Sequence, residues 1–304
     1  MSGNPGHKYI KAGLKICSEI RLPELLPTDF EGRPDVEIRH SAVPTTLPGG
    51  VRSMFEAQVA SGAVLLTIPG VGRYHVLAGS EIGIEPFPEA KIEDVRLFLL
   101  GSAFGAIYLQ RGYFPLHASV VDIEGKAVAF AGDSGAGKST MGAWMNRQGY
   151  PLLCDDVCVI RMNEDQTPMA FPAYPQMKLW KDALRLLELE ASGLRRDYAR
   201  ADKFHLPVET LFAEEPVPLR QIFFLRYSDD APVPVMEEIS PPEAVPLLRN
   251  NTYRYQFISG LELTEKHFRD CISIAKSVPT HFLDRPRKLS SLNDCQRLIE
   301  EQLA

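Results

Sequence analysis

One glycine-rich stretch constrains the fold of this chain more than any other feature. It reads Gly132-Asp133-Ser134-Gly135-Ala136-Gly137-Lys138-Ser139 and matches the pattern G-x-x-x-x-G-K-S/T without a mismatch. An apolar run at residues 127–131 precedes it, and residues 140–145 can continue as a helix. A strand, a glycine-rich loop and a helix form the arrangement that cradles phosphate groups, because glycines let backbone N–H groups turn inward. The sequence therefore predicts a phosphate-binding loop.

The residues of this loop have separate expected roles in binding a nucleotide. We expect the stretch from Gly132 to Thr140 to surround the phosphates with backbone N–H groups, at a helix N-terminus that adds positive charge. Lys138 is expected to reach the outer phosphates, and Ser139 to offer its hydroxyl to Mg²⁺. ATP and Mg²⁺ are the cofactors that this pattern predicts. The alternative is a glycine-rich turn that matches by chance, and the flanking strand and helix argue against it.

Two adjacent carboxylates follow the loop in the sequence, separated from it by about one helix and one turn. Asp155 and Asp156 interrupt an apolar run that extends from Tyr150 to Ile160. Buried carboxylates cost free energy unless they are paired or bound to a cation. Neighbours on a regular strand point to opposite faces, so one aspartate would face Mg²⁺ and the loop while the other sits at a kink and faces an acceptor. A surface turn is the alternative, and the apolar flanks argue against it.

The pattern of short strands and helices predicts an α/β chain with two domains. Residues 1–90 are predicted to form a smaller, mostly-β N-terminal domain that recognises a partner or supports the remainder, and residues 91–304 a larger domain with the phosphate-binding loop and C-terminal helices. Strands are expected in the first part at 36–39, 54–59, 63–68 and 73–78. A largely buried helix is expected at 91–111.

The loop is predicted to follow the second arm of a hairpin, formed by strands 120–123 and 127–131. Further strands are expected at 150–160, 167–171, 221–227, 233–236 and 278–283, and helices at 181–192, from residue 241, at 264–277 and at 288–303. The polar run at 195–205 is interpreted as a mobile loop over the site or as a solvated surface.

Composition limits the class of protein. The chain has 304 residues and a formal net charge of −6, which argues against a broad nucleic-acid footprint. No apolar run approaches the length needed to span a membrane, and the polar start lacks the apolar core of a signal peptide. The 5 cysteines contain no C-x-x-C pairing. A reduced, cytoplasmic setting is therefore expected.

Three motifs in order resemble the bacterial HPr kinase/phosphorylase family. They are the strand at 116–123 with His117, the loop at 132–140, and the stretch 149–156 that ends in the aspartate pair. The resemblance covers roughly residues 113–160. It implies an α/β P-loop kinase core similar to HPr kinase and to the phosphoenolpyruvate carboxykinase-like fold, which agrees with entry from a hairpin.

The chain also departs from that family. Thr140 stands where the family usually has Glu, and the later L-E-x-R-G-L-G signature is absent from 187–194, so the reverse phosphorylase reaction is not implied. The stretch Tyr174–Trp180 looks instead like divergent HPr kinase-like proteins of peptide natural-product clusters, some of which phosphorylate a serine of a lasso-peptide precursor. The resemblance therefore implies an ATP-dependent serine kinase whose acceptor is a peptide or small protein. Family members are often oligomers, and an oligomer is left open here.

The resemblance also assigns roles to residues. Asp155 would be the general base, while Asp156 and Ser139 would hold Mg²⁺; the sequence alone allows the two aspartates to exchange roles. His117 would contact the γ-phosphate or the acceptor, and an ordinary structural histidine is the alternative. A further cation should face the developing charge, and the candidates are Lys178, Lys203 and Arg254.

Four other functions remain open at this point. They are an HPr-type kinase/phosphorylase, an ATPase or nucleotide-gated binding protein, a kinase of a small molecule in the same fold, and a degenerate homologue. The presence of Lys138, Ser139, Asp155 and Asp156 argues against the last.

Overall fold

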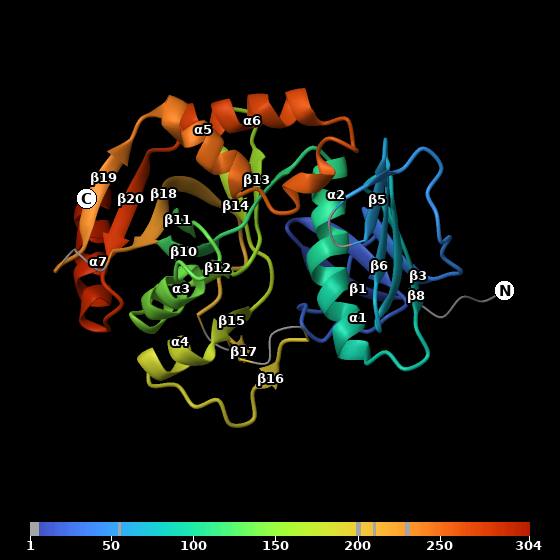
Figure 1. Cartoon of the computed structure of the whole chain (residues 1–304), viewed down its shortest axis with the longest axis horizontal. Coiled ribbons are helices and arrows are strands. Elements are labelled where there is room, and N and C mark those ends of the chain that lie inside the picture. The colour runs from blue at the N-terminus through green and yellow to red at the C-terminus, as the bar shows by residue number, and fades with distance from the viewer. Residues whose placement is uncertain (1–5, 54–55, 199–201, 209–210, 229–231) are drawn as a thin grey trace. The chain divides into compact units, whose positions relative to one another are not determined.

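The chain divides into two compact units, and each is described here by itself (Figure 1). The computed structural model describes residues 6–53, 56–198, 202–208, 211–228 and 232–304. The first unit comprises Met1–Pro115 and Thr252–Arg269, and the second comprises Leu116–Asn251 and Asp270–Ala304.

The first boundary therefore lies after Pro115, later than the expected one at residue 90. The helical residues that follow residue 90 stay with the first unit because they pack on its sheet. The hydroxyl of Tyr74, which is fully buried, donates a hydrogen bond of 2.9 Å to the carbonyl of Val95. Residues 252–269 also return to this unit, where Arg254 Nη2 donates to Ser102 Oγ at 2.6 Å.

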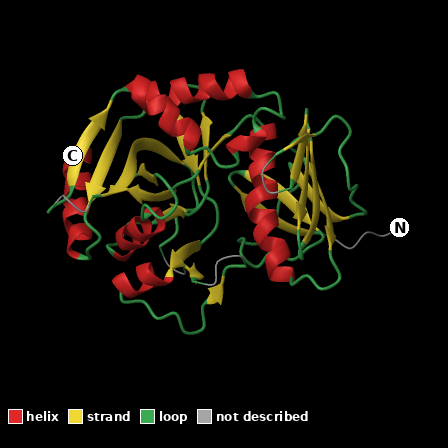
Figure 2. Cartoon of the chain, in the orientation of Figure 1, coloured by secondary structure: helices red, strands yellow, loops and turns green. Residues whose placement is uncertain are grey.

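The first unit is built on one mixed sheet, which contains both antiparallel and parallel strand pairs (Figure 2). Among the described residues its strand order is β1-β2-β3-β8-β7-β6-β5-β4. The strands are β1 (His7–Lys11), β2 (Leu14–Ser18), β3 (Val36–His40), β4 (Val51–Arg52), β5 (Ala57–Ala60), β6 (Ala63–Ile68), β7 (Gly72–Leu77) and β8 (Glu81–Pro86). The strands expected at 36–39, 63–68 and 73–78 are present as β3, β6 and β7, whereas β1, β2, β4 and β8 were not predicted individually. Residues 54–55 of one expected strand lie outside the described residues.

The expected helix at 91–111 is confirmed as one helical segment with an irregular centre. It consists of α1 (Ile92–Phe98), a π-helical turn at Leu99–Ala103 and α2 (Phe104–Gln110). Its inner face is apolar and buried, which explains the dense run of hydrophobic residues in the sequence.

The second unit contains the larger sheet. Its order is β12-β10-β11-β18-β14-β13-β9, and β20 pairs with both β18 and β19. The strands are β9 (Phe114–Leu116), β10 (Ser119–Ile123), β11 (Lys126–Ala131), β12 (Leu152–Cys154), β13 (Cys158–Met162), β14 (Pro168–Phe171), β18 (Val217–Tyr227), β19 (Val235–Ile239) and β20 (Thr280–Arg285). The predicted hairpin is confirmed, with Val120 opposite Ala129.

Three neighbouring strands of this sheet run in the same direction. β11 is parallel to β18, and β18 is parallel to β20, with Tyr227 opposite Arg285. The carboxyl ends of parallel strands meet at one edge of a sheet, which is where ligands bind in open α/β sheets. Residues that follow β11, β18 and β20 are therefore brought to the same edge.

A small sheet and several helices complete the second unit. The sheet has the order β15-β17-β16, with β15 (Gln176–Trp180), β16 (Arg195–Arg196) and β17 (Lys203–Pro207). The helices are α3 (Lys138–Arg147), α4 (Lys181–Leu186), α5 (Pro241–Asn250) and α7 (Ser290–Leu303). Helix α6 (Thr264–Ser277) crosses the boundary after Arg269, and a 3₁₀ turn at Tyr255–Phe257 belongs to the first unit. None of the helices in the described part of the chain is long and apolar enough to cross a membrane.

Two expectations for residues 181–205 were wrong in detail. The helix predicted at 181–192 ends at Leu186, because Glu188 adopts a left-handed backbone conformation with φ of 53°. The polar run at 195–205 contributes β16 and the start of β17, so its described ends belong to a sheet. The middle of that run, residues 199–201, lies outside the described residues.

The core of the second unit is centred on aromatic contacts between its parallel strands. Phe130 of β11 and Phe223 of β18 are fully buried, and their rings stack with centroids 6.2 Å apart. Since β11 leads directly into the glycine-rich loop, this contact holds the strand from which the loop departs.

We therefore expect Phe223→Ala to destabilise the protein by about 3–5 kcal/mol, because it removes a buried ring and leaves a cavity. Val235→Ala on β19 is the matched control, since Val235 is 50% exposed and its truncation should change the free energy of unfolding by about 0.5 kcal/mol or less. Urea denaturation followed by circular dichroism measures both. A cost below about 1 kcal/mol for Phe223→Ala would contradict this description of the core.

Candidate active site

The glycine-rich loop connects β11 to α3, as the sequence predicts. Asp133, Ser134 and Gly135 are exposed at its tip, and Ala136 is buried. Gly132 and Gly137 need to be glycine, because both have positive φ, 129° and 92°, and a Cβ at either would collide with neighbouring atoms. Gly137 is the N-cap of α3, so the first turn of this helix, with Lys138, Ser139 and Thr140, opens directly from the loop.

Lys138 folds back over the loop that precedes it. Its Nζ donates hydrogen bonds of 2.8 Å and 3.0 Å to the carbonyls of Gly132 and Asp133, and the residue is only 8% exposed. Burial lowers the pKa of Lys138, while the negative charges of Asp156 and Asp155 oppose that shift. The structure thus brings the predicted lysine and both predicted aspartates into one electrostatic group.

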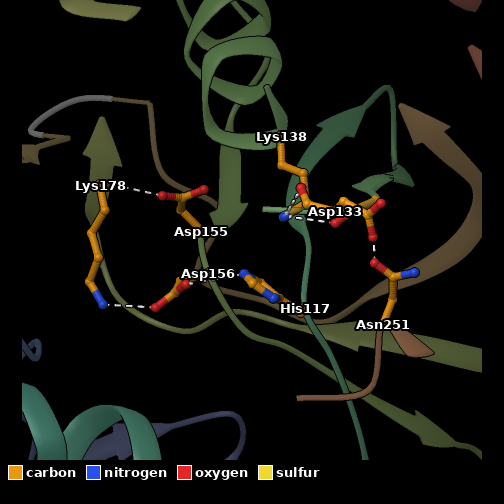
Figure 3. Close-up of polar contacts among 8 residues, drawn as sticks. His117, Asp133, Lys138, Asp155, Asp156, Lys178 and Asn251 are labelled. Carbon is orange, nitrogen blue, oxygen red and sulfur yellow. Dashed lines mark hydrogen bonds and ion pairs between the residues drawn. The ribbon is translucent and has the colours of Figure 1, made fainter. Parts of the chain in front are cut away.

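The aspartate pair does not lie within a continuous strand, and that expectation was wrong. β12 ends at Cys154 and β13 begins at Cys158, so the chain leaves the pairing with β10 and enters the pairing with β14 at this point. Asp156 has a left-handed conformation with φ of 77°, which aspartate tolerates better than bulkier residues. The two carboxylates are therefore oriented by a sharp change of direction instead of by strand alternation (Figure 3).

Asp155 is the more buried of the two, with 5% of its surface exposed. Its Oδ2 accepts a hydrogen bond of 2.8 Å from the backbone N–H of Lys178. Its Oδ1 is buried and has no hydrogen-bond partner among the described residues. A buried carboxylate oxygen without a partner is costly, so this oxygen is the one available to a ligand or to a reacting hydroxyl.

Asp156 is held on both sides by cationic or ionisable groups, as Figure 3 shows. Lys178 Nζ lies 2.8 Å from Oδ2, and His117 Nε2 lies 3.4 Å from Oδ1. Burial alone would raise the pKa of Asp156, but Lys178 and His117 together hold it well below the usual range for a carboxyl. Asp156 is therefore ionised throughout the neutral range, which is the state that binds a cation.

Two of the three candidate cations lie at this site. Lys178 on β15 and Lys203 on β17 are each 8% exposed, and the charge of Lys203 contributes to the low pKa of Asp156. In the antiparallel register Lys178 is opposite His205 and Trp180 is opposite Lys203, so the two lysines share one face of the small sheet. The third candidate, Arg254, belongs to the first unit, whereas Lys178 and Lys203 belong to the second.

Asn251 is a site residue that the sequence analysis did not assign. Its side-chain Oδ1 accepts a hydrogen bond of 3.0 Å from the N–H of Gly132, and its carbonyl accepts one of 2.7 Å from the N–H of His117. It therefore connects the start of the glycine-rich loop to the short segment between β9 and β10 that carries His117, a residue that lies outside both strands. The polar group at residues 249–254 was noticeable in the sequence, but no motif relates it to a loop more than a hundred residues away.

The residues of the site determine which kind of ligand it can bind. It combines a glycine loop at a helix N-terminus, three buried lysines and two carboxylates, of which one has an available oxygen. No group of three or more His, Cys, Asp or Glu side chains in the described ranges is placed to hold a metal ion by itself. The arrangement suits a polyanion, with a cation shared between the polyanion and one or two protein oxygens.

Comparisons with known proteins find weak structural similarity and no sequence family. No protein-family model matches the chain, and no curated protein matches it. Among solved structures it is similar to the Hpr(Ser) kinase/phosphatase from Coxiella burnetii, with 14% identity and a TM-score of 0.35 over 62% of this chain and 96% of that chain. At these values the similarity carries no argument about function, which is based below on the residues of this chain.

The pairing of Asp156 predicts how stability depends on pH. Because its pKa is lower in the folded than in the unfolded state, the pair stabilises the protein above about pH 4, and this stability is lost as the pH falls further. We expect Asp156→Asn to cost about 1–3 kcal/mol at pH 7, with the difference from the unchanged protein shrinking below about pH 4.

Urea denaturation at a series of pH values between 7 and 3 measures this difference. Asp165→Asn, in the exposed turn between β13 and β14, is the control for loss of one carboxylate. A difference between Asp156→Asn and the unchanged protein that stays constant down to the lowest pH would show that ionisation of Asp156 does not stabilise the fold.

Proposed function

We propose that this protein is an ATP-dependent serine kinase that transfers the γ-phosphoryl group of ATP to a serine hydroxyl of a peptide or small protein. The observation that carries the proposal is the buried Oδ1 of Asp155, which has no hydrogen-bond partner in the described part of the chain and shares a site with Lys138 and the glycine-rich loop. We infer a cytoplasmic enzyme, in keeping with its cysteine usage.

The residues of the loop fit a nucleotide polyphosphate. The loop opens onto the first turn of α3, and Lys138 Nζ donates to two loop carbonyls in the absence of a better acceptor. Phosphate oxygens are stronger acceptors than carbonyls, so Lys138 would exchange these bonds for bonds to the outer phosphates. The backbone N–H groups of residues 135–140 would hold the remaining phosphate oxygens.

Mg²⁺ fits the same site as part of a complex with the nucleotide. Ser139, in the first turn of α3, and the ionised carboxylate of Asp156 would hold it, directly or through water. When bound, Mg²⁺ neutralises the negative charge that otherwise repels an incoming nucleophile. Lys178 and His117 keep Asp156 ionised and fix its orientation.

Asp155 is the residue that we assign as general base. A serine hydroxyl placed near its Oδ1 would donate its proton to that oxygen as the serine oxygen bonds to the γ-phosphorus. The bond between the γ-phosphorus and ADP breaks in the same reaction, so the products are ADP, a phosphoserine and a protonated Asp155. The hydrogen bond from the Lys178 N–H holds the carboxylate in position for this transfer.

Lys178 and Lys203 are assigned to stabilise the charge that spreads over the transferred group. Both ammonium groups are largely buried beside Asp156, in surroundings where charge interactions are weakly screened. His117 would contact the γ-phosphate or the acceptor from the opposite side of Asp156.

Replacement of Lys138 tests the phosphate cradle. We expect Lys138→Ala to weaken ATP binding by about 100-fold, because it removes charge-assisted hydrogen bonds to the phosphates. Lys181→Ala, an exposed lysine on α4, is the control and should bind ATP with an affinity close to that of the unchanged protein. Isothermal titration calorimetry measures both, and equal affinities would argue against the cradle.

Replacement of Asp155 separates binding from chemistry. We expect Asp155→Asn to bind ATP within about threefold of the unchanged protein and to transfer phosphoryl about 10²- to 10⁴-fold more slowly. Intact-mass spectrometry of serine-containing peptides incubated with ATP and Mg²⁺ measures the transfer. If Asp155→Asn phosphorylates peptides at the normal rate, Asp155 is not the base, and Asp156 becomes the remaining candidate.

The same measurement distinguishes the second candidate function, an ATPase. The available Asp155 oxygen would serve equally to activate water, so that candidate predicts ADP and inorganic phosphate with no gain of mass on any peptide.

A further inference from the structure

Arg285 is a buried cation that the proposed mechanism does not use. It is the last residue of β20 and is fully buried. Its Nη2 donates a hydrogen bond of 3.0 Å to the hydroxyl of Tyr227, the last residue of β18, and its guanidinium carbon lies 4.6 Å from the centre of the Tyr227 ring. Because β18 and β20 are parallel and adjacent, both residues stand at the same edge of the sheet as the end of β11.

The guanidinium of Arg285 is not satisfied within the described part of the chain. Its Nε and Nη1 are buried and have no hydrogen-bond partner there. Arginine stays protonated in proteins, so burial cannot be relieved by loss of the proton. A buried charge with unpaired donors is strongly unfavourable, and such a group normally has an anionic or carbonyl partner.

The side chain of Arg285 is directed at the glycine-rich loop. A Cβ placed on Gly137 would collide with Arg285 Nη2 and would lie 2.7 Å from the Tyr227 hydroxyl. Gly137 is the N-cap of α3, which runs for 10 residues from Lys138 to Arg147. The helix N-terminus contributes partial positive charge at the same point. Two sources of positive charge therefore adjoin one another, and their common complement is an anion.

From this arrangement we infer that Arg285 binds a phosphate group of the nucleotide held by the loop, with Tyr227 as the residue that positions it. The inference rests on the proposed function, which supplies the phosphate. The planar guanidinium has five N–H donors, and Nη2 uses one of them on Tyr227, so Nε and Nη1 still have donors for phosphate oxygens. Arg285 thus adds a side-chain contact on the flank of the loop that lies toward β18 and β20.

Arg287 provides a matched control. Its guanidinium lies 4.2 Å from the centre of the same Tyr227 ring, but the residue is exposed. Arg287→Met therefore removes one positive charge and one ring contact from the same neighbourhood without touching the buried fork. A general loss of charge would affect both variants, whereas loss of the phosphate contact would affect Arg285→Met alone.

The experiment measures the affinity of ATP and of inorganic pyrophosphate for the unchanged protein and for Arg285→Met and Arg287→Met by titration calorimetry. We expect Arg285→Met to weaken both ligands by the same factor, about 10- to 100-fold, because the lost contact is to phosphate and not to the nucleoside. Arg287→Met should stay within about twofold, as expected for an exposed charge. Without ligand, Arg285→Met should melt at the same temperature as the unchanged protein or higher, because a buried unpaired charge is gone.

The outcomes separate this inference from the proposed function. If the unchanged protein binds neither ATP nor pyrophosphate, the proposed function fails and the inference fails with it. If the unchanged protein binds both and a folded Arg285→Met binds them equally well, only the role of Arg285 is refuted. If Arg285→Met does not fold, Tyr227→Phe decides: a loss of about 3- to 10-fold for both ligands supports the inference, and unchanged affinity shows that Arg285 is purely structural.

Discussion

Asp155 and Asp156 occupy the point at which the chain leaves one strand pairing and enters another, and the rest of the site depends on how their two charges are compensated. β12 and the first three residues of β13, Cys158–Ile160, are apolar and buried, so the carboxylates between the two strands lie at the edge of a hydrophobic core. Asp156 is compensated by Lys178 and His117. Within the ranges that the structure describes, Asp155 has a hydrogen-bond partner at one oxygen, a backbone N–H, and its other oxygen is available for chemistry.

The site is otherwise rich in buried positive charge. Lys138, Lys178 and Lys203 are each 8% exposed, and Arg285 is fully buried on the other flank of the loop. Side chains of this kind are almost never fully buried unless they are paired. These four positively charged side chains outnumber the two carboxylates, Asp155 and Asp156. A bound polyphosphate would supply the negative charges that neutralise the remaining positive charge.

The features that the sequence predicted are those determined over short distances along the chain. The hairpin at 119–131, the loop and the start of α3 follow from neighbouring residues and are all present. A kink at the aspartate pair was expected, but the complete break between β12 and β13 was not, because their pairing partners, β10 and β14, are remote in sequence. Asn251 and Arg285 were not assigned for the same reason: Asn251 contacts a loop residue 119 positions away, and the partner of Arg285 is 58 positions away.

The central claim is that this site moves a phosphoryl group from ATP to a serine, and ³¹P nuclear magnetic resonance tests it most directly. The protein is incubated with ATP, Mg²⁺ and serine-containing peptides while the γ-phosphorus signal of ATP is followed. The account predicts that this signal declines as the signals of ADP and of a phosphate monoester on the peptide grow together. ATP signals that stay unchanged, or a decline that yields only inorganic phosphate, would contradict it.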